Sequence, residues 1–168
     1  PAFAMAVGSL CQAWAELEYA ALLLLAVLTE MPRNQDTLSI LRCFEFRSQL
    51  AAIKVAVVAT QKNLVIVDHV VEAVDHIDAA LRPRRNRLVH DRWAEIGDPV
   101  TAHRITETPR VRRTQAFQPR EVTWREQTPE TFLSIQTTVH EVAAYTDHLY
   151  GAVAALAKPG EASLQELT

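Results

Sequence analysis

The segment from Arg85 to His90 combines a permanently charged side chain with one that can carry protons at cellular pH. It reads Arg-Asn-Arg-Leu-Val-His. Histidine titrates near neutral pH, so His90 can act as a general acid or base, and arginine can hold phosphate oxygens. On a helix Asn86 lies one turn before His90 on the same face, where it can orient the imidazole ring or hold a sugar. Arg85 is about 140° round the helix from His90, but its side chain is long enough to converge on it.

These residue types fit the cleavage of RNA, which carries its own nucleophile in the 2′-hydroxyl group. Cleavage needs a proton taken from that hydroxyl, a proton given to the 5′-oxygen and stabilisation of the charged phosphorane between them. A histidine can move the protons, and an arginine can stabilise the phosphorane. The expected products carry a 2′,3′-cyclic phosphate and a 5′-hydroxyl, and no metal or other cofactor is required.

The charge of the chain is distributed unevenly. Its 168 residues carry a formal net charge of −3, which excludes a protein that is basic throughout. Residues 82–125 nevertheless hold 11 of the 17 basic residues, all arginine, against five acids, so this window carries +6 and the remainder −9. Such a patch on an acidic body can bind a polyanion locally. The candidates for flanking phosphate contacts are Arg82, Arg84, Arg87, Arg112 and Arg113. Alternatively, these arginines pair with acids of neighbouring helices or of a partner chain.

Apolar residues recur at three- and four-residue intervals along most of the chain, which is the pattern of helices with one buried face. The spacing predicts a first helix from Ala2 to about Glu30 and a second from Asp36, its N-cap, to about Gln61. A third covers Leu64–Leu81. Pro83 then predicts a kink or short break before a fourth helix that runs to about Glu95.

The pattern changes between Pro99 and Gln127, where threonine, proline and arginine replace leucine and alanine. Ala102–Thr106 and Val122–Arg125 alternate as strands do, so this stretch predicts a small β-hairpin or an irregular excursion. Thr128-Pro129-Glu130 then predicts the start of a last helix that reaches about Leu156.

Together these elements predict an all-α protein. We expect an up-and-down bundle of four to five helices, with the hairpin or excursion (residues 97–127) before the last helix. Residues 1–157 would form one domain, and residues 158–168 a flexible tail.

The Arg85–His90 segment resembles the R-polar-x-x-x-H motif of the HEPN superfamily of all-helical domains. The resemblance extends over the helical frame from Ala2 to about Leu156, although its specific part is only six residues. Many members are metal-independent ribonucleases of bacterial toxin–antitoxin, abortive-infection and CRISPR systems. The resemblance implies a catalytic Arg85 and His90 with an orienting Asn86. It also implies a homodimer that brings two motifs into one cleft, and a cognate antitoxin protein as a possible partner.

Two other interpretations are compatible with the same residues. Many HEPN-like domains are non-catalytic modules that bind nucleic acid, a nucleotide or a protein partner. The chain can also be a plain helical scaffold, with the arginines on a solvated face and His90 packed beside Trp93. A binding module keeps its affinity when His90 is removed, whereas a scaffold loses only solubility when Arg84 and Arg87 are neutralised.

Further residues could support or replace this site. Glu18 lies one helical turn after Trp14, beside the apolar stripe, and predicts a buried carboxylate that pairs with a motif arginine. His69, Glu72 and His76 share a helical face, but the spacing misses the Glu-x-x-His pattern of di-iron bundles. An acidic, solvent-facing stripe is therefore expected there, without a metal.

The sequence also bears on location. The apolar run Tyr19–Leu28 has ten residues, about half of what a membrane span needs. It predicts a buried helix and no membrane partner. No signal-peptide pattern is evident, and two cysteines do not make a disulfide scaffold, so we expect a cytoplasmic protein.

Overall fold

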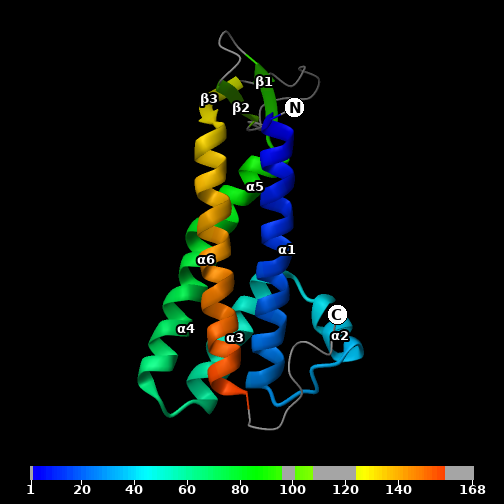
Figure 1. Ribbon diagram of the computed structural model, residues 1–168, viewed down its shortest axis with the longest axis vertical. Coiled ribbons are helices and arrows are strands. Elements are labelled where there is room, and N and C mark those ends of the chain that lie inside the picture. Colours follow the sequence, from blue (N-terminus) through cyan, green and yellow to red (C-terminus); the bar gives the residue numbers. More distant parts are fainter. Residues whose placement is uncertain (1, 96–100, 108–123, 158–168) are drawn as a thin grey trace, which may run out of the picture.

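The computed structural model describes residues 2–95, 101–107 and 124–157. It is a bundle of helices with a small sheet inserted before the last helix (Figure 1), which confirms the all-α prediction. The elements are α1 (Ala2–Leu28), α2 (Gln35–Arg42), α3 (Phe46–Thr60), α4 (Leu64–His76), the π-helical turn η1 (Ile77–Leu81), α5 (Arg82–His90), β1 (Arg92–Glu95), β2 (Thr101–Glu107), β3 (Trp124–Thr131) and α6 (Phe132–Leu156).

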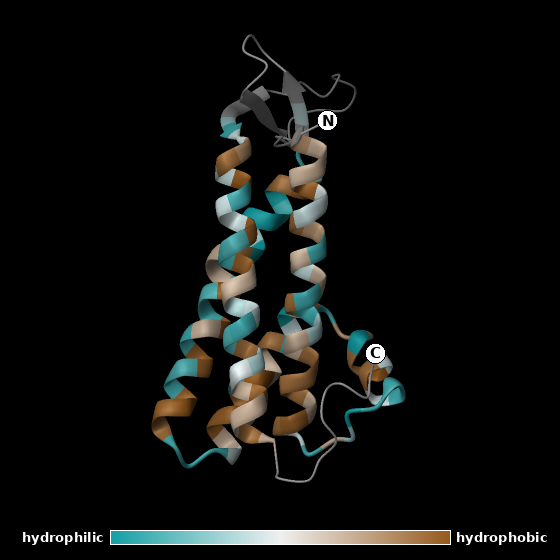
Figure 2. Ribbon diagram, in the orientation of Figure 1, coloured by the Kyte–Doolittle hydropathy of each residue, from teal (hydrophilic) through white to brown (hydrophobic). Residues whose placement is uncertain are grey.

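Helix α1 is the centre of the bundle. Every residue from Ala20 to Ala26 is buried, and α6 and α3 pack along the helix. Figure 2 shows its most hydrophobic turns in the C-terminal half. Burying one leucine side chain stabilises the fold by about 1.5–3 kcal/mol, so this stretch carries much of the core. By length and composition α1 could cross a membrane, but 56% of its most apolar window is buried within the bundle, which is compatible with a soluble protein.

The second predicted helix is two helices in the structure. Helix α2 ends at Arg42, and α3 begins at Phe46. The buried Gln49 stabilises the break, because its Nε2 donates to the carbonyl oxygens of Leu41 at 3.1 Å and Phe44 at 2.8 Å. The N-cap is also not Asp36: the side chain of Asn34 accepts from the Thr37 amide at 2.9 Å. Helix α2 carries the chain back along α1, so α3 runs in the same direction as α1 (Figure 1).

The predicted new helical start at Pro83 is confirmed, since α5 carries this proline in its first turn, but the chain does not leave the helical conformation before it. The backbone stays helical from α4 through η1 into α5, with Leu81 and Arg82 both in the αR region. Proline lacks an N–H group, and its ring collides with the carbonyl four residues earlier in a regular helix. That carbonyl belongs to Ala79, inside the wider π turn, so η1 accommodates the proline. Helix α5 ends at His90 rather than near Glu95, because Asp91 is extended and β1 follows.

Strands β1, β2 and β3 form an antiparallel sheet in that order. The predicted strand Ala102–Thr106 lies within β2, whereas Val122 of the other predicted strand falls outside the described residues. The predicted helix start at residues 128–130 is wrong, since Thr128 pairs with Arg104 in the sheet. Pro129 is tolerated there because β3 is an edge strand.

Helix α6 starts one turn later than predicted and has the same kind of cap. The Thr131 hydroxyl accepts from the Ser134 amide at 3.1 Å, and the Ser134 hydroxyl accepts from the Thr131 amide at 3.1 Å. This reciprocal capping box satisfies two backbone donors at the point where the strand becomes a helix.

Replacing the capping threonine should destabilise the fold measurably. Thr131→Ala should lower the free energy of unfolding by about 1 kcal/mol, because an amide at the start of α6 loses its acceptor. Thr137→Ala is the matched control, since the Thr137 hydroxyl only bonds back to the Leu133 carbonyl within the helix. Its unfolding free energy should stay the same or rise slightly. Urea unfolding measures both, and equal losses would contradict the role of the cap.

Packing of α6 near α1 has a consequence at alkaline pH. Burial, followed by the charge of Glu16 and by Tyr19, raises the pKa of Tyr150 above its usual value. The folded chain then keeps a phenol proton that the unfolded chain loses, so stability falls as pH rises above about 10. Tyr150→Phe should lose less stability than the wild type between about pH 9 and about pH 11. Urea midpoints at both values test this, and identical midpoint shifts would refute it.

Candidate functional site

The three motif side chains meet at the last two turns of α5. The Arg85 Nη1 atom donates to Asn86 Oδ1 at 3.2 Å and lies 3.4 Å from Nε2 of His90. Arg85 and Asn86 are half-buried, and His90 is exposed. The long arginine side chain therefore spans the angular gap that the helix leaves between Arg85 and His90, as the sequence predicts.

The contact between Arg85 and His90 depends on the tautomer of the ring. Arginine only donates, so the 3.4 Å contact can be a hydrogen bond only when Nε2 of His90 carries no proton. In that tautomer the ring proton is on Nδ1, and Nε2 is the atom able to accept a proton from a substrate hydroxyl. The imidazole is thus exposed to solvent with its basic atom beside a cation.

The ring of Trp14 in α1 packs against the guanidinium of Arg85. The guanidinium carbon of Arg85 lies 5.7 Å from the centre of the Trp14 ring, within the range of a cation–π contact. Phe46 packs against the same indole with the two ring planes nearly perpendicular and the ring centres 5.5 Å apart. The Nε atom of Arg85 is buried and has no hydrogen-bond partner in the described part of the chain. The arginine is held by an aromatic ring and keeps an unused donor.

The predicted pairing of Glu18 with a motif arginine takes a different form. Glu18 accepts from the indole Nε1 of Trp14 at 2.8 Å, and no direct bond to Arg85 is found between described residues. The carboxylate therefore acts on the arginine through the ring that it orients. The four-residue spacing of Trp14 and Glu18 is visible in the sequence, but the role of the indole as a platform depends on how α5 packs on α1.

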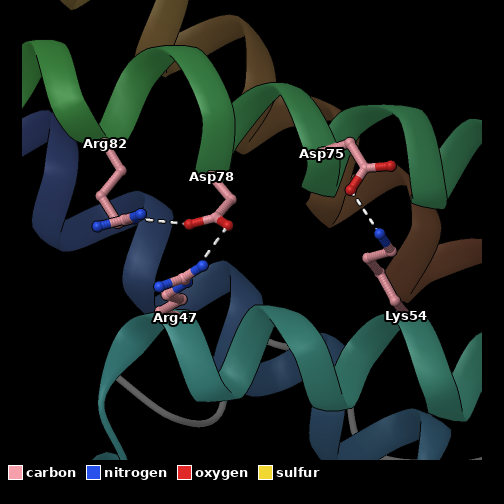
Figure 3. A network of polar contacts seen from close by, with 5 residues as sticks. All are labelled: Arg47, Lys54, Asp75, Asp78 and Arg82. Carbon is pink, nitrogen blue, oxygen red and sulfur yellow. Dashed lines mark hydrogen bonds and ion pairs between the residues drawn. The ribbon is translucent and has the colours of Figure 1, made fainter.

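The neighbouring arginines are in different environments, and Figure 3 shows that of Arg82. Arg82 donates to Asp78 at 2.6 Å, and the same carboxylate lies 3.7 Å from Arg47 of α3. Arg84 donates to the Ser134 carbonyl at 3.2 Å, and Arg87 is exposed. Arg82 thus links α5 to α3, whereas Arg84, Arg87 and His90 follow one another at three-residue spacing on the exposed side. Arg112 and Arg113 lie outside the described residues.

The histidines of α4 contact α6 and do not converge on one centre. His69 Nε2 lies 2.9 Å from His148 Nδ1, and His76 Nε2 lies 2.9 Å from Glu141 Oε1. Tyr145 stacks on His76. Within residues 2–95, 101–107 and 124–157, no three His, Cys, Asp or Glu residues gather as metal ligands would.

Comparison of the chain with protein-family models, with curated proteins and with solved structures found no match. Its function therefore has to be inferred from the residues and their geometry.

The bond between Trp14 and Glu18 should be measurable by a double-mutant cycle. Combining Trp14→Phe with Glu18→Ala should reveal a coupling of about 1.5 kcal/mol in urea unfolding, because the bond joins a partly buried donor to a charged acceptor. Trp93→Phe combined with Glu18→Ala is the control, since the Trp93 indole donates to the Leu88 carbonyl instead. Its coupling should be near zero, and equal couplings in both cycles would contradict this arrangement.

Proposed function

We propose that this protein is a metal-independent endoribonuclease of the HEPN type. The observation that carries the proposal is the contact of Arg85 with both Asn86 and His90 on an exposed helical face. The three residue types required by the chemistry are thereby gathered at one place. Arg85 stabilises the charged phosphorane, His90 transfers a proton, and Asn86 holds the guanidinium or the sugar.

The reaction transfers two protons, and each chain supplies one motif histidine. The Nε2 atom of one His90 accepts the proton of the 2′-hydroxyl, and the oxygen attacks phosphorus. The 5′-oxygen then leaves with a proton from the histidine of a second copy of the chain. A symmetric dimer that faces two α5 helices across one cleft meets this need. At 3.4 Å the contact of His90 with Arg85 is long for a hydrogen bond, so a substrate hydroxyl can replace it.

The surrounding charges favour a strand of RNA across α5. Arg84 and Arg87 are exposed beside His90 and are suited to flanking phosphates. Arg82 already pairs with Asp78, so its contribution is to hold α5 in place. Arg112 and Arg113 extend the basic patch in sequence. We place this activity in the cytoplasm of a bacterium, in a defence or toxin–antitoxin system, with a cognate antitoxin as the regulatory partner.

Cleavage in the absence of metal tests the proposal. A structured RNA pool is incubated in excess EDTA with the wild type, with His90→Ala and with His140→Ala, which removes an exposed histidine from α6. The wild type and His140→Ala should leave 2′,3′-cyclic phosphate ends. His90→Ala should be slower by at least about a hundredfold, because it lacks the proton-transfer group.

Two results would refute the proposal that this chain is a ribonuclease acting through His90. Equal cleavage by wild type and His90→Ala would assign the activity to another site or to a contaminant. RNA binding that survives His90→Ala, with no cleavage by the wild type of the pool or of total tRNA, would favour the non-catalytic binding module instead.

A further inference from the structure

A cavity of about 370 Å³ lies between α1 and the turn that joins α2 to α3. This volume falls within the range of about 300–1,000 Å³ that small-molecule sites occupy. One face of α1 forms one wall, with residues at helical spacing. The cavity is lined by Ala15, Glu18, Tyr19 and Leu22 from α1, and by Arg42, Phe44, Phe46 and Gln49 from the opposite side.

Two side chains of the cavity offer hydrogen-bond acceptors. Glu18 presents a carboxylate whose orientation is set by Trp14 at 2.8 Å. Gln49 is only 5% exposed, and its Nε2 donates to two backbone carbonyls. The remaining oxygen, Oε1, is buried without a hydrogen-bond partner among the described residues. The Glu18 carboxylate accepts hydrogen bonds when ionised, so the lining favours a ligand that brings N–H donors.

The other side chains offer aromatic faces and one cation. Tyr19, Phe44 and Phe46 contribute rings, and Phe44 is 56% exposed. The guanidinium of Arg42 lies 6.0 Å from the centre of the Tyr19 ring. A planar ligand can stack on these rings, and Arg42 can donate to its acceptor atoms. The ligand class is therefore a flat heterocycle with donors along one edge and acceptors along another.

We propose that this cavity binds a guanine base. Guanine carries two adjacent donors, N1–H and the N2 amino group, which match a carboxylate acceptor such as Glu18. Its O6 and N7 atoms are the acceptors that arginine recognises, and Arg42 can donate to them. Adenine and cytosine place an acceptor beside their amino group, and uracil has a single N–H donor. These bases would leave acceptor facing acceptor, which the cavity disfavours.

The cavity adjoins the α5 motif through one residue. Trp14 bonds to Glu18, packs on Phe46 and carries Arg85 on its ring. Because Trp14 contacts both places, a base in the cavity and a phosphate at Arg85 can belong to one RNA strand. In naming RNA as the source of the guanine, the inference rests on the proposed function. The binding of the base itself does not depend on cleavage.

Binding of uncleavable ligands tests the cavity directly. Tetranucleotides of 2′-fluoro RNA with one central guanine, inosine, adenine, cytosine or uracil are titrated into the full chain, alongside free GMP and AMP. Fluorescence anisotropy follows the oligonucleotides and calorimetry the free nucleotides. The guanine oligonucleotide should bind about tenfold to a hundredfold tighter than the inosine one, which lacks only the N2 amino group. Tighter binding of guanine in RNA than of GMP identifies a strand as the natural source, and the reverse identifies a free nucleotide.

Variants locate the preference in the cavity. Glu18→Gln can still accept from the Trp14 indole, but it should reduce the guanine-to-inosine ratio to about one, because the carboxylate is gone. Phe44→Ala should weaken the guanine oligonucleotide about fivefold to a hundredfold through lost stacking. Ile40→Ala is the matched control, since Ile40 is an exposed residue of α2 that does not line the cavity.

The outcomes separate the cavity from the ribonuclease. Equal binding of all five oligonucleotides overturns the proposal that the cavity binds guanine, even if RNA is cleaved. A guanine preference that survives Glu18→Gln does the same. A guanine preference that Glu18→Gln removes supports the cavity even if no RNA is cleaved, in which case only the ribonuclease proposal fails.

Discussion

The burial of α1 sets how the other helices pack. Seven consecutive residues, from Ala20 to Ala26, are buried, so packing must cover this helix around its circumference and not along one stripe. Helices α3 and α6 cover much of it, and α2 covers a further part after the chain returns along α1. A helix enclosed in this way has a fixed rotation about its axis. The side chains of its N-terminal half therefore have fixed directions as well.

The candidate site uses that fixed rotation. Trp14 belongs to the buried side of α1 and provides the ring on which Arg85 lies. Leu88 of α5 is buried one turn further along, and its carbonyl accepts from the Trp93 indole where the first strand begins. The motif thus sits on a helix held by core packing on one side and by the sheet at its end. A site on such an element can hold its geometry before a substrate arrives.

Four arginines of the same chemistry make different contacts in this region. Arg82, Arg84, Arg85 and Arg87 are nearly consecutive in the sequence, yet each has a different neighbour. Arg82 pairs with Asp78, Arg84 donates to a backbone carbonyl, Arg85 lies on an indole, and Arg87 is exposed, as Arg84 is. The net charge of residues 82–125 does not distinguish these four roles. The positions along the helix turn decide which arginine is available to a phosphate and which is part of the bundle.

Elements with a strong local signal could be predicted from the sequence. The periods of α1, α4 and α6 and the placement of Asn86 one turn before His90 follow from repeated apolar spacing and helix geometry. Where competing local signals were nearly equal in energy, contacts made in the folded protein selected the outcome. Pairing in the sheet extended β3 through Thr128, so α6 is capped at Thr131, three residues after the predicted cap. The packing of α5 on α1 likewise placed Arg85 on the Trp14 ring, and the buried Gln49 stabilises a break between α2 and α3 that the apolar spacing does not indicate. A single cap or hydrogen bond contributes about 1 kcal/mol to stability. The free energy gained by burying the core around α1 is larger.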